Sequence, residues 1–171
     1  MTDAKPILPN VSTEQSATTN KVTEPKVRER KVSKNRRKSR ELVLKALYQR
    51  EMNVQDVLQM RRDATIDPDF NHADAGYFKA LLEGVCANIE ALDTRILSYI
   101  DRKLAELSPI EHAILRVSAY ELIFDMSIPY KVAINEGVEL AKVYGGTDGH
   151  KYVNGVLDKI AADARPNEFR R

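Results

Sequence analysis

A chain of 171 residues, 43% hydrophobic and 30% charged, is long enough for one domain with a single core and an additional tail. Its one cysteine, Cys86, excludes an internal disulfide, and no apolar run approaches the roughly 18 residues that a membrane span needs. The first thirty residues lack the apolar centre of a secretory signal peptide. We therefore expect a cytoplasmic protein without a membrane-embedded part.

The net charge of +2 conceals a strong asymmetry along the chain. Residues 26–40 contain nine Lys or Arg and one Glu, whereas residues 1–25 carry a net charge of −1. The rest of the chain therefore carries −5, so the basic character is confined to one short segment on a mildly acidic body. Such a segment favours an anionic partner, and nucleic acid is the leading candidate.

Two regions of different composition follow one another along the chain. Residues 1–34 are rich in Thr, Ser, Lys, Glu and Pro, and they contain too few apolar residues to offset the entropy of ordering them. We predict a disordered basic N-terminal tail there. Residues 35–168 show apolar side chains at helical spacing and no alternating strand pattern, which predicts one all-helical domain.

The first half of this domain is predicted to contain three helical segments. We expect a helix over residues 34–52 and a shorter one over residues 54–62, followed by a loop over residues 63–74. Apolar residues then recur at helical spacing over residues 75–100, with a break near residues 90–93.

The next helix has the clearest start signal. Ser108 is a good N-cap, Pro109 suits the first helical position, and Glu111 completes a capping box. This helix is expected to continue to residue 124.

Two further helices complete the predicted fold. Pro129 opens the first, which should end at Gly145-Gly146, where glycine readily supplies a left-handed C-terminal residue. The last begins near Asp148, an acceptable N-cap, and stops before Pro166. The predicted fold class is all-α, a compact single-domain bundle of about six or seven helices.

A search for catalytic chemistry finds no candidate. The three histidines, His72, His112 and His150, are far apart and share no metal-ligand spacing with Cys86. The turn over residues 145–151 lacks the adjacent Gly-Lys and the preceding strand of a phosphate-binding loop. We therefore predict no enzyme, no catalytic residue, no cofactor and no metal site.

The basic segment is the strongest signal that single residues provide. On a helix, Arg37, Arg40, Leu44 and Tyr48 follow one line, which would place guanidinium groups and an aromatic ring along one edge. Arginine binds phosphates, and tyrosine can stack on an unpaired base, so this edge suits single-stranded RNA. The alternative is a solubilising basic tail with Tyr48 at the rim of the core. The candidate RNA-binding residues here are Arg36, Arg37, Lys38, Arg40 and Tyr48.

Polar residues in the later helices also allow two interpretations. Tyr130, Tyr144 and Tyr152 could form a partner-binding face, or each could pack its ring on the core with a solvated hydroxyl. Asn154, a poor helix former, could cap a neighbouring helix end or contact a ligand. Arg116, within an apolar helix, is expected to pair with a carboxylate inside the fold.

Three stretches carry a resemblance to a known family. They are RRKSRELVLKALY at residues 36–48, LSPIEHAILRVSAYEL at residues 107–122, and IPYKVAINEGVELAKVYGGTDGHKYVNGVLDKI at residues 128–160. In this order they resemble the NusB family of bacterial transcription antitermination factors, and the third stretch is the most specific. Together they span roughly residues 36–166.

The resemblance implies a non-catalytic RNA-binding protein. NusB-like proteins pair with NusE, which is also a ribosomal protein of the small subunit, and the pair binds boxA-type single-stranded RNA in ribosomal RNA operon transcripts. The pair helps RNA polymerase to read through terminators, which adds the polymerase antitermination complex as a partner. A homodimer is a further option, in which the basic edge could be masked.

Positions in this sequence that match family positions receive roles by the same resemblance. Glu111 and Asp148 would join the arginine-rich start and Tyr48 near the RNA, and Glu111 would contact either the RNA or NusE. The NusE side would comprise Tyr130, Val132, Tyr144, Lys151, Tyr152 and Asn154.

Two other classes of protein remain as alternatives. A related helical fold precedes the catalytic domain of RNA cytosine methyltransferases, but an enzyme of that kind requires a further cofactor-binding domain. A dimerising helical module would explain the core and leave the basic edge without a purpose.

Overall fold

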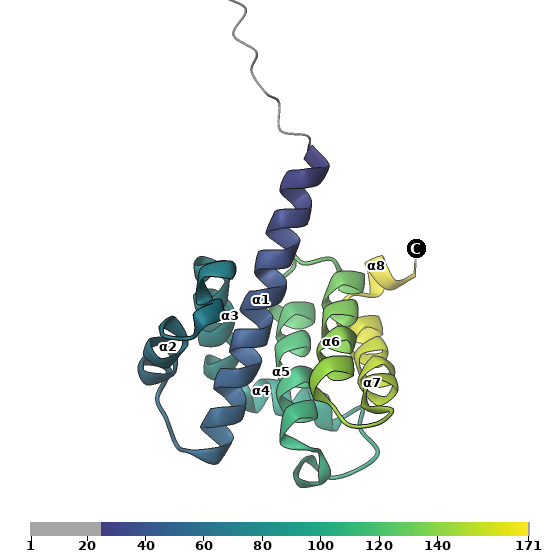
Figure 1. Cartoon of the computed structure of the whole chain (residues 1–171). Coiled ribbons are helices and arrows are strands. Elements are labelled where there is room, and N and C mark those ends of the chain that lie inside the picture. The colour runs from purple at the N-terminus through teal and green to yellow at the C-terminus, as the bar shows by residue number, and fades with distance from the viewer. Residues whose placement is uncertain (1–24, 171) are drawn as a thin grey trace, which may run out of the picture.

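The computed structural model describes the backbone of residues 25–170, and the side chains of residues 31, 32 and 34–170. Within residues 25–170 the regular structure is entirely helical, and seven of the helices have nine residues or more, which confirms the predicted all-α bundle (Figure 1). The helices are α1 (Pro25–Met52), α2 (Val57–Thr65), α3 (Ala75–Ala87), α4 (Ile89–Leu97), α5 (Pro109–Phe124), α6 (Tyr130–Tyr144), α7 (Gly149–Ala164) and α8 (Pro166–Phe169), with 3₁₀ turns at Pro68–His72 (η1) and Leu104–Glu106 (η2).

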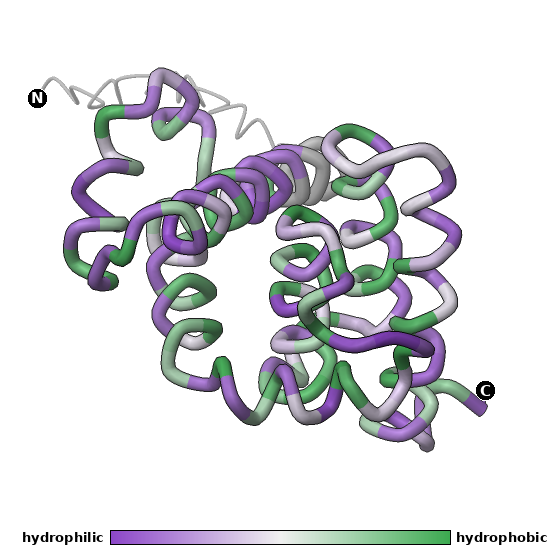
Figure 2. Tube along the Cα trace, turned by 90° about the horizontal axis from the view of Figure 1, so that it is seen from below, coloured by the Kyte–Doolittle hydropathy of each residue, from purple (hydrophilic) through white to green (hydrophobic). Residues whose placement is uncertain are grey.

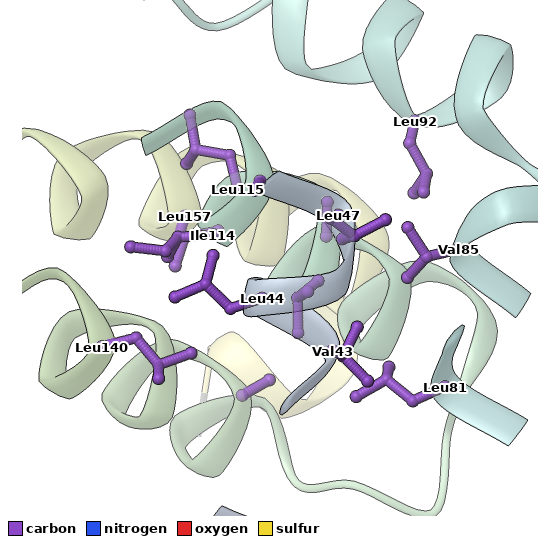
Figure 3. Close-up of a cluster of buried hydrophobic side chains, with 14 of the residues drawn as sticks. Val43, Leu44, Leu47, Leu81, Val85, Leu92, Ile114, Leu115, Leu140 and Leu157 are labelled. Atoms are coloured by element: carbon purple, nitrogen blue, oxygen red, sulfur yellow. The ribbon is translucent and has the colours of Figure 1, made fainter. Parts of the chain in front are cut away.

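Helix α1 runs through the middle of the bundle, with α2 and α3 on one side and α5, α6 and α7 on the other (Figure 1). Its inner face supplies Val43, Leu44 and Leu47, which meet buried side chains from five other helices (Figure 3). Each fully buried aliphatic side chain contributes about 1.5–3 kcal/mol, so α1 anchors the fold. Its partners in this cluster are Leu81, Val85, Leu92, Ile114, Leu115, Leu140 and Leu157.

The start of α1 differs from its prediction. The helix begins at Pro25 instead of near residue 34, so residues 25–34 of the predicted disordered tail are helical and project beyond the body (Figure 1). Proline suits the first position, and the lysines, arginines and glutamate that follow are good helix formers. The core-anchored turns also remove the nucleation cost, so each added residue needs only propagation. The predicted disorder of residues 1–24 lies outside the described residues.

The middle of the chain matches the prediction with shifted boundaries. Helix α2 begins at Val57, because Asp56 caps it with a side-chain oxygen 2.8 Å from the Gln59 amide nitrogen. The break in the long helical segment falls at Asn88 instead of residues 90–93. The side-chain amide of Asn88 donates a hydrogen bond to the Gly84 carbonyl at 2.7 Å. The predicted loop contains the last residues of α2 and the η1 turn.

Helix α5 has the predicted N-cap, with Ser108 accepting a hydrogen bond from the Glu111 amide at 3.1 Å. Its residues 113–119 are all buried, since α1, α3, α4, α6 and α7 pack around it. Helix α6 comes particularly close at Gly137, where an added Cβ would lie 2.3 Å from the Ser118 hydroxyl oxygen. Around the other helices, hydrophilic and hydrophobic residues alternate as expected for amphipathic helices (Figure 2).

The turn between α6 and α7 corrects two predictions. Gly145 is extended, with φ −82° and ψ 173°, and the left-handed residue is Asp148, at φ 60°. Asp148 makes no side-chain cap to α7; its carboxylate lies 3.2 Å from Lys151 Nζ instead. Aspartate tolerates the left-handed region better than most residues, so the two glycines are not needed for it.

Candidate nucleic-acid interface

Arg37 is the most exposed arginine of the predicted basic edge. Its side chain is 50% exposed, and its guanidinium forms two hydrogen bonds to Glu136 on α6, with Nε 2.9 Å from Oε2 and Nη2 2.9 Å from Oε1. The hydrogen bonds to Glu136 raise the pKa of Arg37 above its ordinary value. Arg37 therefore stands at the surface as a charged group whose direction is held by a second helix.

Arg40 is not at the surface, and the prediction of one exposed edge is wrong in this respect. It is 3% exposed, and its Nε and Nη2 lie 2.7 and 2.9 Å from the carboxylate of Glu121 on α5. The Tyr77 hydroxyl accepts a further bond from Nη2 at 3.3 Å. Leu44, on the same predicted line, is 1% exposed, so this face of α1 turns into the core.

The neighbouring cations occupy intermediate positions. Arg36 is half-buried, with its Cζ 4.8 Å from the centre of the Tyr77 ring. Lys38 is also half-buried, with Nζ 2.7 Å from Glu41 and 3.4 Å from Asp69. Both can add positive potential beside Arg37, although each already has a partner within the fold.

Tyr48 and the two predicted acidic contacts lie toward the other end of the bundle. Tyr48 is 36% exposed and follows Arg37 by eleven residues, which corresponds to about 16 Å along the helix axis. Helix α5 runs antiparallel to α1, as the contacts of Glu51 with Arg116 and of Arg40 with Glu121 require. Glu111, at the start of α5, therefore lies near the end of α1 that carries Tyr48 and away from Arg37.

Glu111 and the turn before α7 form one site. An added Cβ on the buried Gly149 would lie 2.5 Å from Glu111 Oε1, so glycine makes room for this carboxylate. A carboxylate near the first turn of α7 is favoured by the helix dipole. Asp148, which is exposed, stands beside it. The structure thus brings Glu111 and Asp148 together and separates both from the arginines.

The predicted partner residues fall into two groups along the α6–α7 hairpin. Tyr130 and Val132 lie at the start of α6. The Tyr130 ring packs against Phe169 of α8, with 5.5 Å between the ring centres. Tyr144 ends α6, fourteen residues later, or about 21 Å along the axis. The residues of α7 near this second end are Lys151, Tyr152 and Asn154.

The tyrosine rings of this hairpin are partly buried against the core, which favours the packing interpretation for them. The Tyr152 hydroxyl donates to Asp101 at 3.2 Å, and Arg102 lies over its ring at 4.3 Å. Asn154 is exposed and forms no hydrogen bond with the described residues, so its predicted capping role is not observed. Val132 is 40% exposed, and Lys151 is also exposed.

Several buried charges form a supporting network that the sequence indicated only in part. The predicted pairing of Arg116 is confirmed, since its Nε and Nη2 lie 2.9 and 2.8 Å from Asp93 and its Nη1 lies 2.7 Å from Glu51. Glu136 of α6 belongs to this network and is 7% exposed. The available signal was its spacing from Ala133 and Leu140, which places it on the core side of α6.

Metal-binding and membrane-spanning features are both absent from the described part of the chain. Among the described residues, no group of three or more His, Cys, Asp or Glu side chains is arranged to hold a metal ion. No helix within residues 25–170 is long and apolar enough to cross a membrane.

The fold and this site define a helical binding module, in which cations at one end of a central helix adjoin a hairpin with tyrosine-rich ends. A family model described as the NusB family matches residues 37–162. A transcription antitermination protein NusB from Methylobacillus flagellatus is 64% identical over 141 residues, covering 82% of this chain and 92% of that protein. The chain belongs to the NusB family.

Solved structures agree with this membership. NusB from T. maritima superposes with a TM-score of 0.70 at 33% identity, covering 80% of this chain and 97% of that one. A crystal structure of antitermination factors NusB and NusE in complex with dsRNA gives a TM-score of 0.69 at 25% identity, covering 75% of this chain and 97% of that one.

Proposed function

We propose that this chain is a non-catalytic transcription antitermination factor. It binds boxA-type RNA together with NusE and promotes read-through by RNA polymerase in ribosomal RNA operons, as a member of the polymerase antitermination complex in the cytoplasm. The observation that carries the proposal is the match over three quarters of the chain to a NusB that was crystallised with NusE and dsRNA. The 64% identical relative, named as an antitermination protein, supports it independently.

The RNA side of the proposal centres on Arg37. Its half-exposed guanidinium stands at the surface, and Arg36 and Lys38 flank it in sequence. Arg40 supports this surface from beneath, because its pair with Glu121 holds α1 against α5. Tyr48, Glu111 and Asp148 would meet a different part of the RNA, because they lie toward the other end of α1.

The NusE side of the proposal is the α6–α7 hairpin. Val132, Lys151 and Asn154 offer exposed side chains, and the rims of Tyr130, Tyr144 and Tyr152 add aromatic surface. Tyrosine is favoured at protein interfaces because one residue combines an apolar ring with a polar tip.

Titration of labelled RNA with the full chain, in the presence and absence of NusE, tests the proposal. Three RNAs are compared: single-stranded boxA-type RNA, the same sequence in a duplex, and a scrambled single strand. We expect tightest binding to the first, and a rise in affinity of about tenfold or more when NusE is present. Equal binding of all three RNAs, or no effect of NusE, would contradict the proposal. Sedimentation of the same samples reports whether a homodimer forms and dissociates on binding.

A further inference from the structure

Glu136 holds one side of the Arg37 guanidinium and leaves the other side open. Its carboxylate occupies Nε and the near side of Nη2, both at 2.9 Å. Nη1 of Arg37 donates to no group among the residues that the structure describes. The fork formed by Nη1 and the outer N–H of Nη2 therefore points away from Glu136, on a side chain that is 50% exposed.

The holding carboxylate is itself fixed in place. Glu136 is 7% exposed, and it lies one helical turn from Ala133 and from Leu140, both of which are buried. Its Oε2 also lies 4.0 Å from Nη1 of the buried Arg40. A carboxylate with little freedom of its own restricts the arginine that it holds.

An arginine restricted in this way suits a phosphate group. The planar fork of two N–H donors matches two phosphate oxygens, and this bidentate geometry is stronger and more directional than a single hydrogen bond. A free arginine loses much rotamer freedom when it binds, whereas Arg37 has lost part of that freedom already. The structure therefore carries a preorganised donor pair at the surface of α1.

We propose that Glu136 is a positioning residue that aims the free fork of Arg37 at one phosphate group of the bound RNA. This inference rests on the proposed function, since RNA supplies the phosphate. It makes Arg37 and Glu136 a unit built from α1 and α6, so the helix that carries the RNA contact is tied to the hairpin assigned to the protein partner.

The proposal and simple electrostatics predict opposite effects of neutralising Glu136 on the affinity for RNA. Glu136 is an acidic group close to an RNA-binding arginine, so long-range electrostatics alone predicts that neutralising it strengthens binding to a polyanion. If Glu136 positions Arg37, neutralising it weakens binding, because the fork loses its orientation.

Two matched variants measure this sign. Glu136→Gln should lower the affinity for RNA about fivefold, since the arginine fork is then no longer preorganised. Glu139→Gln removes the same charge from a half-exposed position on the same helix. Its carboxylate lies 3.2 Å from Lys142 Nζ and forms no hydrogen bond with Arg37 among the described residues, so this variant should leave the affinity unchanged or slightly higher. An affinity for Glu136→Gln that is equal to or above that of the unchanged chain overturns the proposal.

Two further variants separate positioning from a general loss of structure. Arg37→Lys keeps the charge and lacks the fork, and it should lower affinity by about tenfold. In the Arg37→Ala background, Glu136→Gln should no longer weaken binding, because no fork remains to be positioned. Thermal melts monitored by circular dichroism verify that each variant is folded. A Glu136→Gln effect that persists without Arg37 would contradict the proposal.

The RNA probes distinguish failure of this inference from failure of the proposed function. The titrations use both boxA-type RNA and a uridine homopolymer, because a phosphate contact carries no sequence information. Equal binding of both RNAs would contradict the boxA assignment and still allow the Glu136 comparison. Binding of neither RNA by the unchanged chain would overturn both proposals.

Discussion

Arg40 of α1 and Glu121 of α5 form a buried ion pair across 81 residues of sequence, with Nε 2.7 Å and Nη2 2.9 Å from the two carboxylate oxygens. Their side chains are 4% and 1% exposed. Arg40, which was predicted on an exposed edge, makes a structural contact that holds two central helices in register.

Breaking this pair should destabilise the fold strongly. Glu121→Gln removes the carboxylate that accepts two hydrogen bonds from the buried Arg40 guanidinium and leaves it the more distant Glu136 at 4.0 Å. We therefore expect a loss of about 3–5 kcal/mol in the free energy of unfolding. Replacing both residues with apolar ones, Arg40→Met with Glu121→Leu, should recover much of that loss. Urea unfolding followed by circular dichroism measures both variants. A single variant that loses less than about 1 kcal/mol would show that the pair contributes little.

The helix crossing at Gly137 offers a test of packing with an internal control. Gly137→Ala would place a Cβ 2.3 Å from Ser118 Oγ and 2.9 Å from Leu157 Cδ1, and we expect it to cost about 1–3 kcal/mol. Gly155→Ala, in α7, meets no atom within 4 Å and should stabilise by about 0.5–1 kcal/mol. Both free energies come from urea unfolding. Effects of the same sign at the two positions would contradict the close approach of α5, α6 and α7.

Acid should weaken the fold through Asp93. Burial alone would raise the pKa of its carboxyl, but hydrogen bonds from Arg116 and His112 outweigh burial and hold that pKa well below its ordinary value. A carboxyl with a depressed pKa stabilises the fold fully at pH values above its pKa in the unfolded chain, which is about 3.9. This stabilisation is lost as the pH falls toward the lower pKa in the folded chain. We therefore expect the free energy of unfolding to fall steeply below about pH 4.

The corresponding variants check that assignment. Asp93→Asn should be about 2–3 kcal/mol less stable at pH 7 and should lose less stability on acidification, because charge-assisted hydrogen bonds are removed at all pH values. Asp163→Asn removes a more exposed partner of Arg95, with a side chain 52% exposed, and should change stability by less than about 1 kcal/mol. Parallel acid profiles for Asp93→Asn and the unchanged chain would assign the acid sensitivity elsewhere.

The projecting start of α1 should contribute to RNA affinity through its charge. Removing residues 1–34 deletes five cations of residues 26–34, whereas removing residues 1–24 leaves all five in place. We expect only the longer deletion to flatten the dependence of log affinity on log salt, by about 0.7 for each phosphate of a single strand that the protein no longer neutralises. Titrations at several salt concentrations measure the two slopes. Identical slopes for the two deletions would show that residues 25–34 make no phosphate contact.

A substitution at Val132 should separate partner binding from RNA binding. Val132→Glu places a charge on the exposed side of α6, and we expect NusE binding to weaken about tenfold or more because a carboxylate would be desolvated at the interface. Val54→Glu, at a fully exposed position before α2, is the control. Calorimetric titration with NusE compares the two. Equal affinities would contradict the assignment of Val132 to the interface.

Local signals predicted the helices well where the stabilising interactions are themselves local. Ser108 caps α5 as expected, since the capping bond joins residues only three apart. Boundaries were less accurate where propagation or a single side chain decided them, as at Pro25 and at Asn88. Asp148 shows the same limit. It adopts the left-handed conformation, although Gly145 and Gly146 were the more favourable candidates for it.

The candidate functional residues show the same difference between local signals and tertiary contacts. The sequence by itself determined the helical class, the order of the main helices and the confinement of positive charge to one helix start, because these follow from composition and from a periodicity set by local hydrogen bonds. Only the tertiary structure decided which arginines remain at the surface. Arg37 and Arg40 meet carboxylates 99 and 81 residues away, and such pairs depend on how α5 and α6 pack against α1.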